Sequence, residues 1–309
     1  MGETGFHGDM DYQGKVVLIT GASSGIGYVT ARAFAARGAT VVGVARRENL
    51  LQELVGECRV DSPKTTYLCG DLGQQAFAEE VVTETIQRFG RLDVLVNNSA
   101  ITKHKQIYHV SPEEAAWTMQ VNFLSPMWTS LAAIPHMLKA GSGAIVNVSS
   151  LGGRIVPPRE TIYAASKSAL NAFSEGLLAD LAGSGIHVAL ILPGPIDTEI
   201  WDKEDEPVAF DGKKHPPELV TAAIFEAIES RIAEIVVPKR DPQLILARLL
   251  RTLAPGVLRR GLRRTDPVPR EIVEQARARA ARGQRLGDLG PQEGSETTGK
   301  SSPGDSRKD

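Results

Sequence analysis

The chain has 309 residues, 42% of them hydrophobic and 23% charged, and carries a formal net charge of −2. That composition is ordinary for a globular protein, and the near-neutral charge gives no overall reason to expect nucleic-acid binding. No run of about 18 apolar residues occurs, so a membrane-spanning helix is not expected.

From Lys15 onward, short apolar runs alternate with longer amphipathic segments. The apolar runs predict strands at residues 15–20, 39–45, 65–71, 92–100, 143–150, 187–196 and 234–239. Amphipathic segments predict helices at 27–38, 47–59 and 77–90. Strands that are apolar throughout and alternate with helices indicate a parallel sheet covered on both faces. Right-handed crossovers then give an α/β fold, a doubly wound Rossmann-type sheet of about seven strands in a single domain with a helical C-terminal extension.

Changes in composition divide the chain into four stretches. Residues 1–10 are expected to form a tail, and 11–240 the domain that holds the sheet. Residues 241–283 are predicted to form a helical basic extension. Residues 284–309 are expected to be disordered, because almost nothing there is apolar enough to bury.

The stretch TGASSGIG follows the first predicted strand and opens the first predicted helix. Its glycines allow a tight turn, and the helix N-terminus adds a partial positive charge, so this loop is suited to cradle a pyrophosphate. The residues expected to contact the cofactor here are Gly21, Ser23, Ser24, Gly25, Ile26 and Gly27.

A tyrosine and a lysine stand four residues apart in YAASK, residues 163–167, with Ser150 thirteen residues before the tyrosine. Alone, such a pair is usually only two solvated side chains on one helix face. Together with the spacing Gly-x-x-x-Gly-x-Gly, it resembles the short-chain dehydrogenase/reductase family, from roughly Lys15 to Thr198. The resemblance implies an oxidoreductase that uses a nicotinamide dinucleotide.

The resemblance assigns roles to four residues. Tyr163 would be the general acid in carbonyl reduction and the general base in alcohol oxidation. A free tyrosine has a pKa of about 10, and the Lys167 ammonium is expected to lower it while also bonding the nicotinamide ribose. Ser150, in preference to Ser149, would bond the substrate oxygen. Asn122 would hold a water that connects Lys167 to solvent, unless it is a helix asparagine that satisfies the backbone.

Other cofactor contacts are implied at the ends of later strands. Asp71 matches the family aspartate that contacts adenine, with a turn-forming aspartate as the alternative. The stretch NNSA at 97–100 matches the family's Asn-Asn-Ala-Gly but departs from it at Ser99 and Ala100. The remaining expected contacts are Leu72, Asn98, Pro193, Gly194, Ile196 and Thr198, with Tyr163 and Lys167 at the nicotinamide.

The end of the second strand discriminates between the two cofactors. An NAD site places an acidic residue there to accept from the ribose hydroxyls. This chain has Ala45, Arg46 and Arg47, and the first acid is Glu48. A guanidinium suits a 2′-phosphate, so NADP(H) is predicted with Arg46 as the preferred contact. NAD(H) is the alternative, in which both arginines are merely solvated.

The predicted reaction interconverts a ketone or aldehyde with an alcohol on a small to medium apolar substrate. Residues 11–240 would then form a dinucleotide-binding catalytic domain, with a mobile substrate lid near 199–217. Trp201, Phe210, Ile155 and Val156 either line the pocket or are ordinary packing residues. A 3-oxoacyl thioester reductase is one alternative, although residues 1–240 carry a net charge of −7 and offer a carrier no basic surface. A non-catalytic nucleotide-sensing protein on the same fold is the other. The family resemblance also implies a homodimer or homotetramer.

A local basic segment follows the predicted sheet. Residues 241–264 hold six arginines against Asp241 alone, a net charge of +5. Leucines between Leu246 and Leu253 recur at helical spacing, and Pro255 should end that helix. The helix either packs its leucines onto its own domain or a partner subunit, or brings residues 244–264 to an anionic membrane surface.

The cellular compartment is inferred from what the sequence lacks. Cys58 and Cys69 show no metal-ligand spacing, so they fit free thiols in a reducing compartment and no metal site is expected. The N-terminal stretch has no apolar core typical of a secretory signal. We therefore expect a cytoplasmic protein.

Overall fold

The computed structural model describes residues 11–203, 205, 212–265 and 267–281. The chain divides into two compact units at residues 266 and 267, and the sheet and the candidate site belong to the first. The described part of the second unit contains one helix, α10 (Arg270–Ala281). The tails expected at 1–10 and 284–309 lie outside the described residues, as does part of the expected lid.

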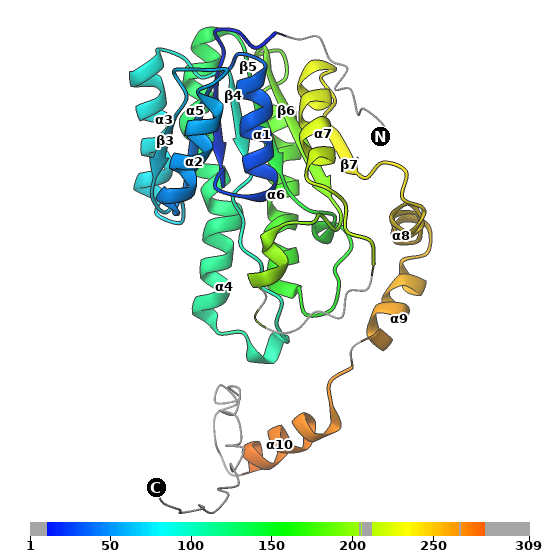
Figure 1. The fold of residues 1–309 in the computed structure, drawn as a ribbon. Helices are drawn as coiled ribbons and strands as arrows, with labels where there is room; N and C mark the ends of the chain where they lie inside the picture. The colour runs from blue at the N-terminus through cyan, green and yellow to red at the C-terminus, as the bar shows by residue number, and fades with distance from the viewer. Residues whose placement is uncertain (1–10, 204, 206–211, 266, 282–309) are drawn as a thin grey trace, which may run out of the picture. The chain divides into compact units, whose positions relative to one another are not determined.

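Seven parallel strands form one sheet in the order β3-β2-β1-β4-β5-β6-β7 (Figure 1). The strands are β1 (Val16–Thr20), β2 (Thr40–Ala45), β3 (Thr66–Cys69), β4 (Val94–Asn97), β5 (Gly143–Val148), β6 (Ile186–Pro193) and β7 (Glu234–Val237). Each strand forms where an apolar run predicts it, so the doubly wound α/β fold is confirmed. The strand order reverses between β1 and β4, and ligands of such sheets bind at the carboxyl ends of the strands near this point.

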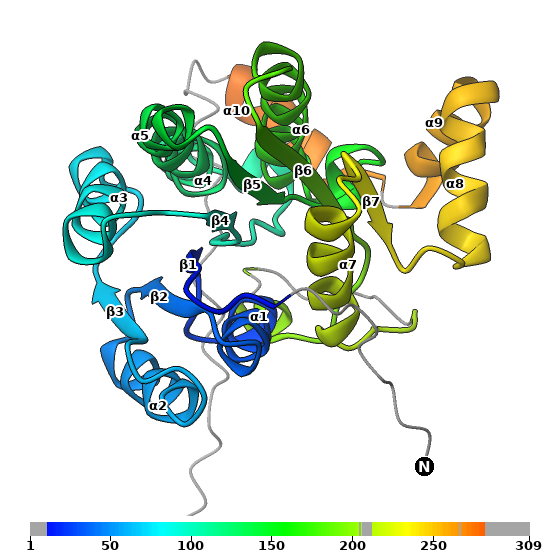
Figure 2. The ribbon, with the colours of Figure 1, turned by 90° about the horizontal axis from the view of Figure 1, so that it is seen from above.

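Helices cover both faces of the sheet, as apolar strands require. The helices of the sheet region are α1 (Gly25–Ala36), α2 (Glu48–Cys58), α3 (Gln75–Phe89), α4 (Pro112–Met119), α5 (Ser125–Ala140), α6 (Thr161–Asp180) and α7 (Glu218–Glu229). Figure 2 shows α1, α2 and α7 on one face and α3, α5 and α6 on the other, each group packed into its own apolar cluster. Four short helical turns lie in the connections, namely η1 (Ile107–His109), η2 (Gln120–Leu124), η3 (Leu151–Gly153) and η4 (Glu199–Lys203).

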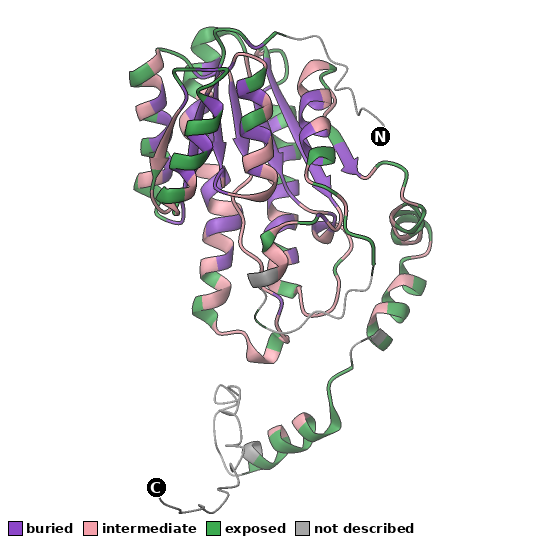
Figure 3. Cartoon of the chain, viewed as in Figure 1, coloured by how far each residue is buried: buried purple, intermediate pink, exposed green. Residues whose placement is uncertain are grey.

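The central strands are buried on both faces, which Figure 3 shows as a continuous layer. On one side, Phe34 of α1 packs between two aromatic rings, with centroids 5.0 Å from Tyr12 and 4.5 Å from Phe225 of α7. This aromatic group joins the segment before β1 to the first and seventh helices. It therefore links parts of the chain that are more than 200 residues apart.

Two further helices follow β7, namely α8 (Pro242–Leu253) and α9 (Pro255–Thr265). The Asp241 carboxylate caps α8 by accepting from the amides of Gln243 and Leu244 at 2.8 and 3.1 Å. The helix ends before Pro255 as predicted, but the chain resumes a helix at that proline, because proline fits the first helical position. Within the described residues, no helix combines the length and apolar character needed to cross a bilayer.

Replacing Phe34 by alanine should lower the free energy of unfolding by about 3–5 kcal/mol, because it leaves a cavity in the aromatic group. Val60 is 82% exposed, and Val60→Ala should change stability by less than about 0.5 kcal/mol. Chemical denaturation of both variants measures the two effects. Similar values for the two would mean that the aromatic group does not stabilise the fold.

Candidate active site

A cavity of about 1150 Å³ is lined by the loops that follow the strands β1 to β6. Its lining includes every residue proposed above for catalysis or cofactor contact except Gly27 and Asn122. The cavity thus brings together residues from positions 21 to 198 that the sequence separates widely. Their functional roles are not fixed by this proximity and stay predictions.

The glycine-rich loop between β1 and α1 needs its glycines for steric reasons. Gly21 and Gly25 have φ angles of +67° and +54°, the left-handed region that favours glycine. A Cβ on Gly27 would lie 2.3 Å from the Gly21 carbonyl oxygen and 2.6 Å from Asn98 Nδ2. Gly27 therefore acts by letting α1 approach the turn closely, which explains why it does not itself line the cavity.

Thr20, at the end of β1, fastens the loop after β4 to the glycine-rich loop. Its hydroxyl accepts hydrogen bonds from the backbone amides of Asn98 and Ser99 at 2.9 and 3.0 Å. The Asn98 side chain donates to the Thr20 carbonyl oxygen at 3.0 Å. Asn98, Ser99 and Ala100 consequently line the cavity beside the glycines, and the two departures from the family pattern belong to the same lining.

The two arginines after β2 have different surroundings. Arg47 donates to Ser23 and Ser24 of the glycine-rich loop, at 2.6 Å for Ser24, and pairs with Glu199 at 2.8 Å. Arg46 is exposed and also lines the cavity. The structure therefore holds Arg47 against the loop and leaves the guanidinium of Arg46, the preferred phosphate contact, beside the cavity.

Asp71, after β3, makes the hydrogen bond of a turn. Its carboxylate accepts from the Gly73 amide at 3.0 Å, as the turn interpretation requires. Asp71 and its neighbour Leu72 also line the cavity, so the two interpretations are compatible. A contact between Asp71 and adenine stays a prediction.

The two serines at the end of β5 point to different partners. The Ser149 hydroxyl donates to the Lys167 carbonyl oxygen at 3.2 Å, whereas Ser150 accepts from the Gly152 amide at 3.0 Å. The Ser150 hydroxyl also acts on Tyr163, where it favours the ionised form and so lowers the pKa of that tyrosine. Ser149, Ser150 and Tyr163 all line the cavity, and the preference for Ser150 as the substrate contact stays a prediction.

Burial is the largest influence on the pKa of Tyr163. It raises the pKa of this tyrosine to about 12, against the opposing effect of the Ser150 hydroxyl, and the Glu160 carboxylate adds to the rise. The lowering expected from Lys167 is therefore not found. The Lys167 ammonium lies 6.0 Å from the Tyr163 ring centre and bonds elsewhere, so it does not offset the loss of solvent.

Lys167 is itself almost fully buried, with 1% of its surface exposed. Its ammonium donates to the Val148 carbonyl oxygen at 3.1 Å. Burial disfavours the charged form and lowers the pKa of Lys167 to about 7. The residue therefore changes charge near neutral pH, at the wall of the cavity.

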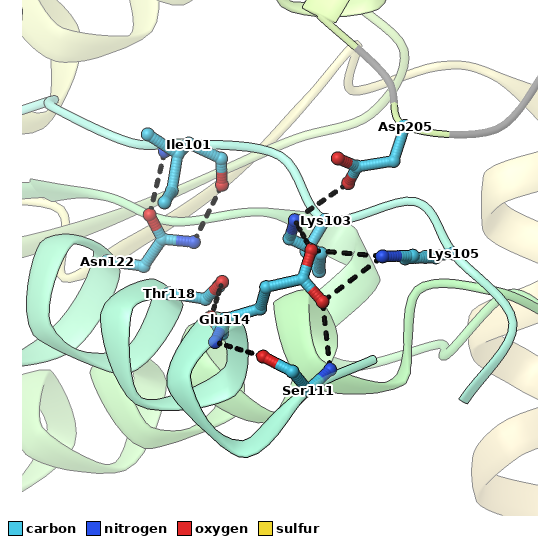
Figure 4. Close-up of polar contacts among 8 residues, drawn as sticks. All are labelled: Ile101, Lys103, Lys105, Ser111, Glu114, Thr118, Asn122 and Asp205. Atoms are coloured by element: carbon cyan, nitrogen blue, oxygen red, sulfur yellow. Dashed lines mark hydrogen bonds and ion pairs between the residues drawn. The ribbon is translucent and has the colours of Figure 1, made fainter. Parts of the chain in front are cut away.

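Asn122 lies in the π-helical turn η2 and is fully buried. Its carboxamide accepts from the Ile101 amide at 2.8 Å and donates to the Ile101 carbonyl oxygen at 2.9 Å (Figure 4). It also donates to the Ser166 hydroxyl at 3.1 Å, one residue before Lys167. The side chain thus satisfies backbone groups, as the alternative interpretation holds, and the water connection stays a prediction.

A charged cluster at the cavity was not foreseen from the sequence. Glu114 of α4 accepts from Lys103 and Lys105, each at 3.1 Å, and from the Ser111 amide at 2.8 Å (Figure 4). Lys103 also pairs with Asp205 at 2.9 Å. Lys103, Glu114 and Asp205 line the cavity. The signal that could have located Glu114 is the Ser-Pro-Glu-Glu pattern, which forms a capping box in the structure.

The electrostatics of this cluster keep it ionised. Burial alone would raise the pKa of Glu114, but bonds from the Ser111 amide, Lys105 and Lys103 lower it to about 2. Burial opposes the charged form of Lys103, yet Asp205 and Glu114 raise its pKa above the ordinary value. The cavity wall near α4 therefore carries ionised side chains of both signs.

The candidate substrate residues are partly brought together. Ile155 and Trp201 line the cavity, and the Trp201 indole donates to the Ile196 carbonyl oxygen at 2.6 Å. Val156 is not part of the lining, and Phe210 lies outside the described residues. Three apolar residues of the C-terminal helices also line the cavity, namely Leu244, Ala247 and Leu262.

A parallel sheet with a glycine-rich loop at its switch point, and a serine, tyrosine and lysine in the same cavity, is the arrangement of a dinucleotide-dependent oxidoreductase. The family model described as short chain dehydrogenase matches residues 15–209. The chain belongs to this family, whose members use NAD(H) or NADP(H).

Known relatives agree with that assignment. The chain is 34% identical over 259 residues to the bovine dehydrogenase/reductase SDR family member 7B, covering 78% of each. It is 37% identical over 198 residues to the 3-oxoacyl-[acyl-carrier-protein] reductase FabG of Thermotoga maritima, covering 64% of this chain and 80% of that one. A short-chain dehydrogenase/reductase of Burkholderia phymatum, solved in complex with NAD, has a TM-score of 0.72 and 26% identity, covering 84% and 99%.

The residues present fit a nicotinamide dinucleotide. The cavity is long enough to run from the glycine-rich loop and the two arginines to Tyr163 and Lys167. Backbone amides at the start of α1 suit the pyrophosphate, and the guanidinium groups suit phosphate oxygens. No carboxylate stands at Ala45, where an acidic ribose contact would be placed.

The buried lysine makes stability depend on pH. Between its pKa of about 7 in the folded protein and about 10.4 in the unfolded chain, the unfolded chain binds one more proton. The free energy of unfolding should therefore rise with pH in this window by about 1.4 kcal/mol per unit from this group. Lys167→Met should lose that slope, measured by chemical denaturation at a series of pH values.

The exposed Lys139 provides the matched control, since Lys139→Met should keep the slope of the wild type. If wild type and Lys167→Met shared one pH dependence, the buried lysine would titrate as it does in the unfolded chain, contrary to the expectation.

Proposed function

We propose that this protein is an NADP(H)-dependent oxidoreductase that interconverts a ketone or aldehyde with an alcohol, on a small to medium apolar substrate. The observation that supports this most is the placement of Ser150, Tyr163 and Lys167 at one cavity. The same cavity is lined by the glycine-rich loop and by both arginines after β2.

Tyr163 would supply the proton in the reductive direction. With a pKa of about 12, it is protonated at neutral pH and able to donate to a carbonyl oxygen. Ser150, which lines the same cavity, would donate a second hydrogen bond to the same oxygen and hold it in place. The bound nicotinamide would supply the hydride to the carbonyl carbon, or accept it in the reverse reaction.

Lys167 would assist the oxidative direction. There Tyr163 must act as a phenolate base, and burial opposes that form. A protonated Lys167 nearby favours the phenolate, yet its own pKa of about 7 limits this help to the acidic side of neutrality. The two shifts together favour reduction of carbonyls near neutral pH.

The choice of NADP(H) is supported by charge at the end of β2. Arg46 and Arg47 both line the cavity, and Arg47 is held on Ser23 and Ser24. Arg47 already has the Glu199 carboxylate as a partner, whereas Arg46 presents its guanidinium at the exposed edge. We therefore assign the 2′-phosphate contact to Arg46, with Arg47 ordering the loop beneath it.

A second candidate is reduction of a 3-oxoacyl thioester. It is supported by the 37% identity to the Thermotoga maritima protein of that name. The chemistry at Tyr163 is the same, so the two candidates differ only in substrate. Comparing a simple ketone with a 3-oxoacyl thioester in one assay, with the same enzyme and cofactor, discriminates between them.

Tyr163→Phe removes the proton donor while leaving the ring in place. The rate of carbonyl reduction should fall by about 100-fold or more, because general acid catalysis typically contributes that much. Binding of NADPH should persist, since the phenyl ring still fills its site. Initial rates over a panel of ketones and aldehydes, with NADPH binding measured beside them, check both expectations. Undiminished turnover by Tyr163→Phe would refute the assigned acid.

Arg46→Asp tests the cofactor assignment. It should weaken NADPH binding by at least about 10-fold, as expected for losing hydrogen bonds between charged groups, and weaken NADH binding less. Arg240→Asp makes the same charge change at an exposed residue outside the cavity lining and should leave both affinities unchanged. Fluorescence titration of the three proteins gives the affinities. Tighter NADH binding by the wild type would favour the NAD(H) alternative.

We also propose an oligomeric state and a cellular location. A homodimer or homotetramer is proposed from the family resemblance, and a cytoplasmic location from the free thiols. Sedimentation velocity of the purified protein and fractionation of the source cells test them.

A further inference from the structure

The C-terminal helices α8 and α9 leave an unusual set of large apolar side chains in solvent. Leu246, Leu249 and Leu253 of α8 are 57%, 51% and 77% exposed, and Val257 of α9 is 59% exposed. Figure 3 shows no buried residue among residues 242–264 of these two helices, whose burial the structure describes. Single exposed leucines are ordinary, but a run over successive turns marks a site of interaction. We call the three leucines of α8 the apolar face.

This face is separate from the side by which α8 packs on the domain. Leu244 packs against Leu151, Leu192 and Val236, and a Cβ on Gly194 would lie 3.0 Å from it. Leu246, Leu249 and Leu253 stand at i, i+3 and i+7, which places them together on another side of the helix. The interpretation in which the leucines pack onto their own domain is therefore wrong for these three.

Arginines accompany the apolar face. Arg248 and Arg251 follow Leu244 by four and seven residues, opposite the exposed leucines, and α9 adds Arg259, Arg260, Arg263 and Arg264. All six are exposed, and none makes a salt bridge with another described residue. The net charge of residues 241–264 is +5, and no salt bridge to another described residue neutralises these arginines.

The positive charge of residues 241–264 and the exposed leucines of α8 together restrict which kind of partner can bind this surface. A second copy on the same face would bring two segments of net charge +5 against each other, which is unfavourable at short range. A nucleic acid would use the arginines but leave the leucines in water. A bilayer with anionic headgroups satisfies both, because the leucines enter the acyl boundary while the arginines reach phosphates.

We propose that α8 and α9 dock this protein on an anionic phospholipid bilayer, through the apolar face and the exposed arginines of both helices. The same two helices contribute Leu244, Ala247 and Leu262 to the lining of the active-site cavity. Docking therefore brings a wall of that cavity next to the membrane, where apolar substrates concentrate. This consequence for substrate access rests on the proposed function, whereas the docking itself does not.

The test is cosedimentation of the full-length protein with lipid vesicles. The wild type should pellet with vesicles of phosphatidylcholine containing phosphatidylglycerol, less so at high salt, and little with phosphatidylcholine alone. The variant Leu246→Ser/Leu249→Ser/Leu253→Ser should lower the partition coefficient by at least about 10-fold. Val60→Ser, which changes another exposed apolar residue, should bind like the wild type. Thermal melts verify that the variants fold.

Three outcomes would overturn the proposal. The first is no pelleting of the wild type at low salt. The second is salt-sensitive pelleting that the triple variant retains, which would mean that the arginines attract any polyanion without insertion. The third is a dimer that dissociates in the triple variant while vesicles bind neither protein, which would make the face a contact between copies. NADPH binding of the same samples reports on the proposed function independently.

Discussion

The Lys167 ammonium, 1% exposed and bonded to the Val148 carbonyl oxygen at 3.1 Å, is the constraint on which the site depends. Burying an ammonium group costs free energy unless an acceptor bonds it, so the end of β5 must lie against α6. Gly153 permits that contact, because a Cβ there would lie 2.8 Å from the Lys167 backbone. Ser168 closes the same junction by donating to the Gly153 carbonyl oxygen at 2.7 Å. Ser150 and Tyr163 meet as a consequence.

Beneath the cavity, buried polar groups fix the central strands in register. Asn97 of β4 stands opposite Asn147 of β5, and their side chains share a hydrogen bond of 2.9 Å. Thr129 and Ser174 satisfy the remaining groups from α5 and α6, at 2.7 and 2.8 Å. A polar pair in an apolar sheet is tolerated because each donor and acceptor is met. The loops that follow β4 and β5 therefore start at the same height along the sheet.

Burial also explains the chemistry of the site. The same loss of solvent raises the pKa of Tyr163 to about 12 and lowers that of Lys167 to about 7. Both residues are thereby shifted toward their neutral forms, in contrast to the ionised cluster of Lys103 and Glu114 across the cavity. A neutral proton donor suits an apolar carbonyl, and Leu151 and Ile155 form an apolar wall of the same cavity. Leu244 extends that wall from the C-terminal helices, so the substrate region and the exposed apolar face share one element.

The sequence by itself determined the features that depend on local order. Apolar runs located every strand, glycine spacing located the turn into α1, and helical spacing placed Tyr163 and Lys167 on one side of α6. Only the tertiary structure decided the contacts between distant segments. In the structure, Arg47 donates to Ser23 and Ser24, and the Asn122 side chain bonds the Ile101 backbone. The loss of solvent around Tyr163 raises its pKa. Those outcomes depend on burial and on partners far along the chain, which periodicity does not encode.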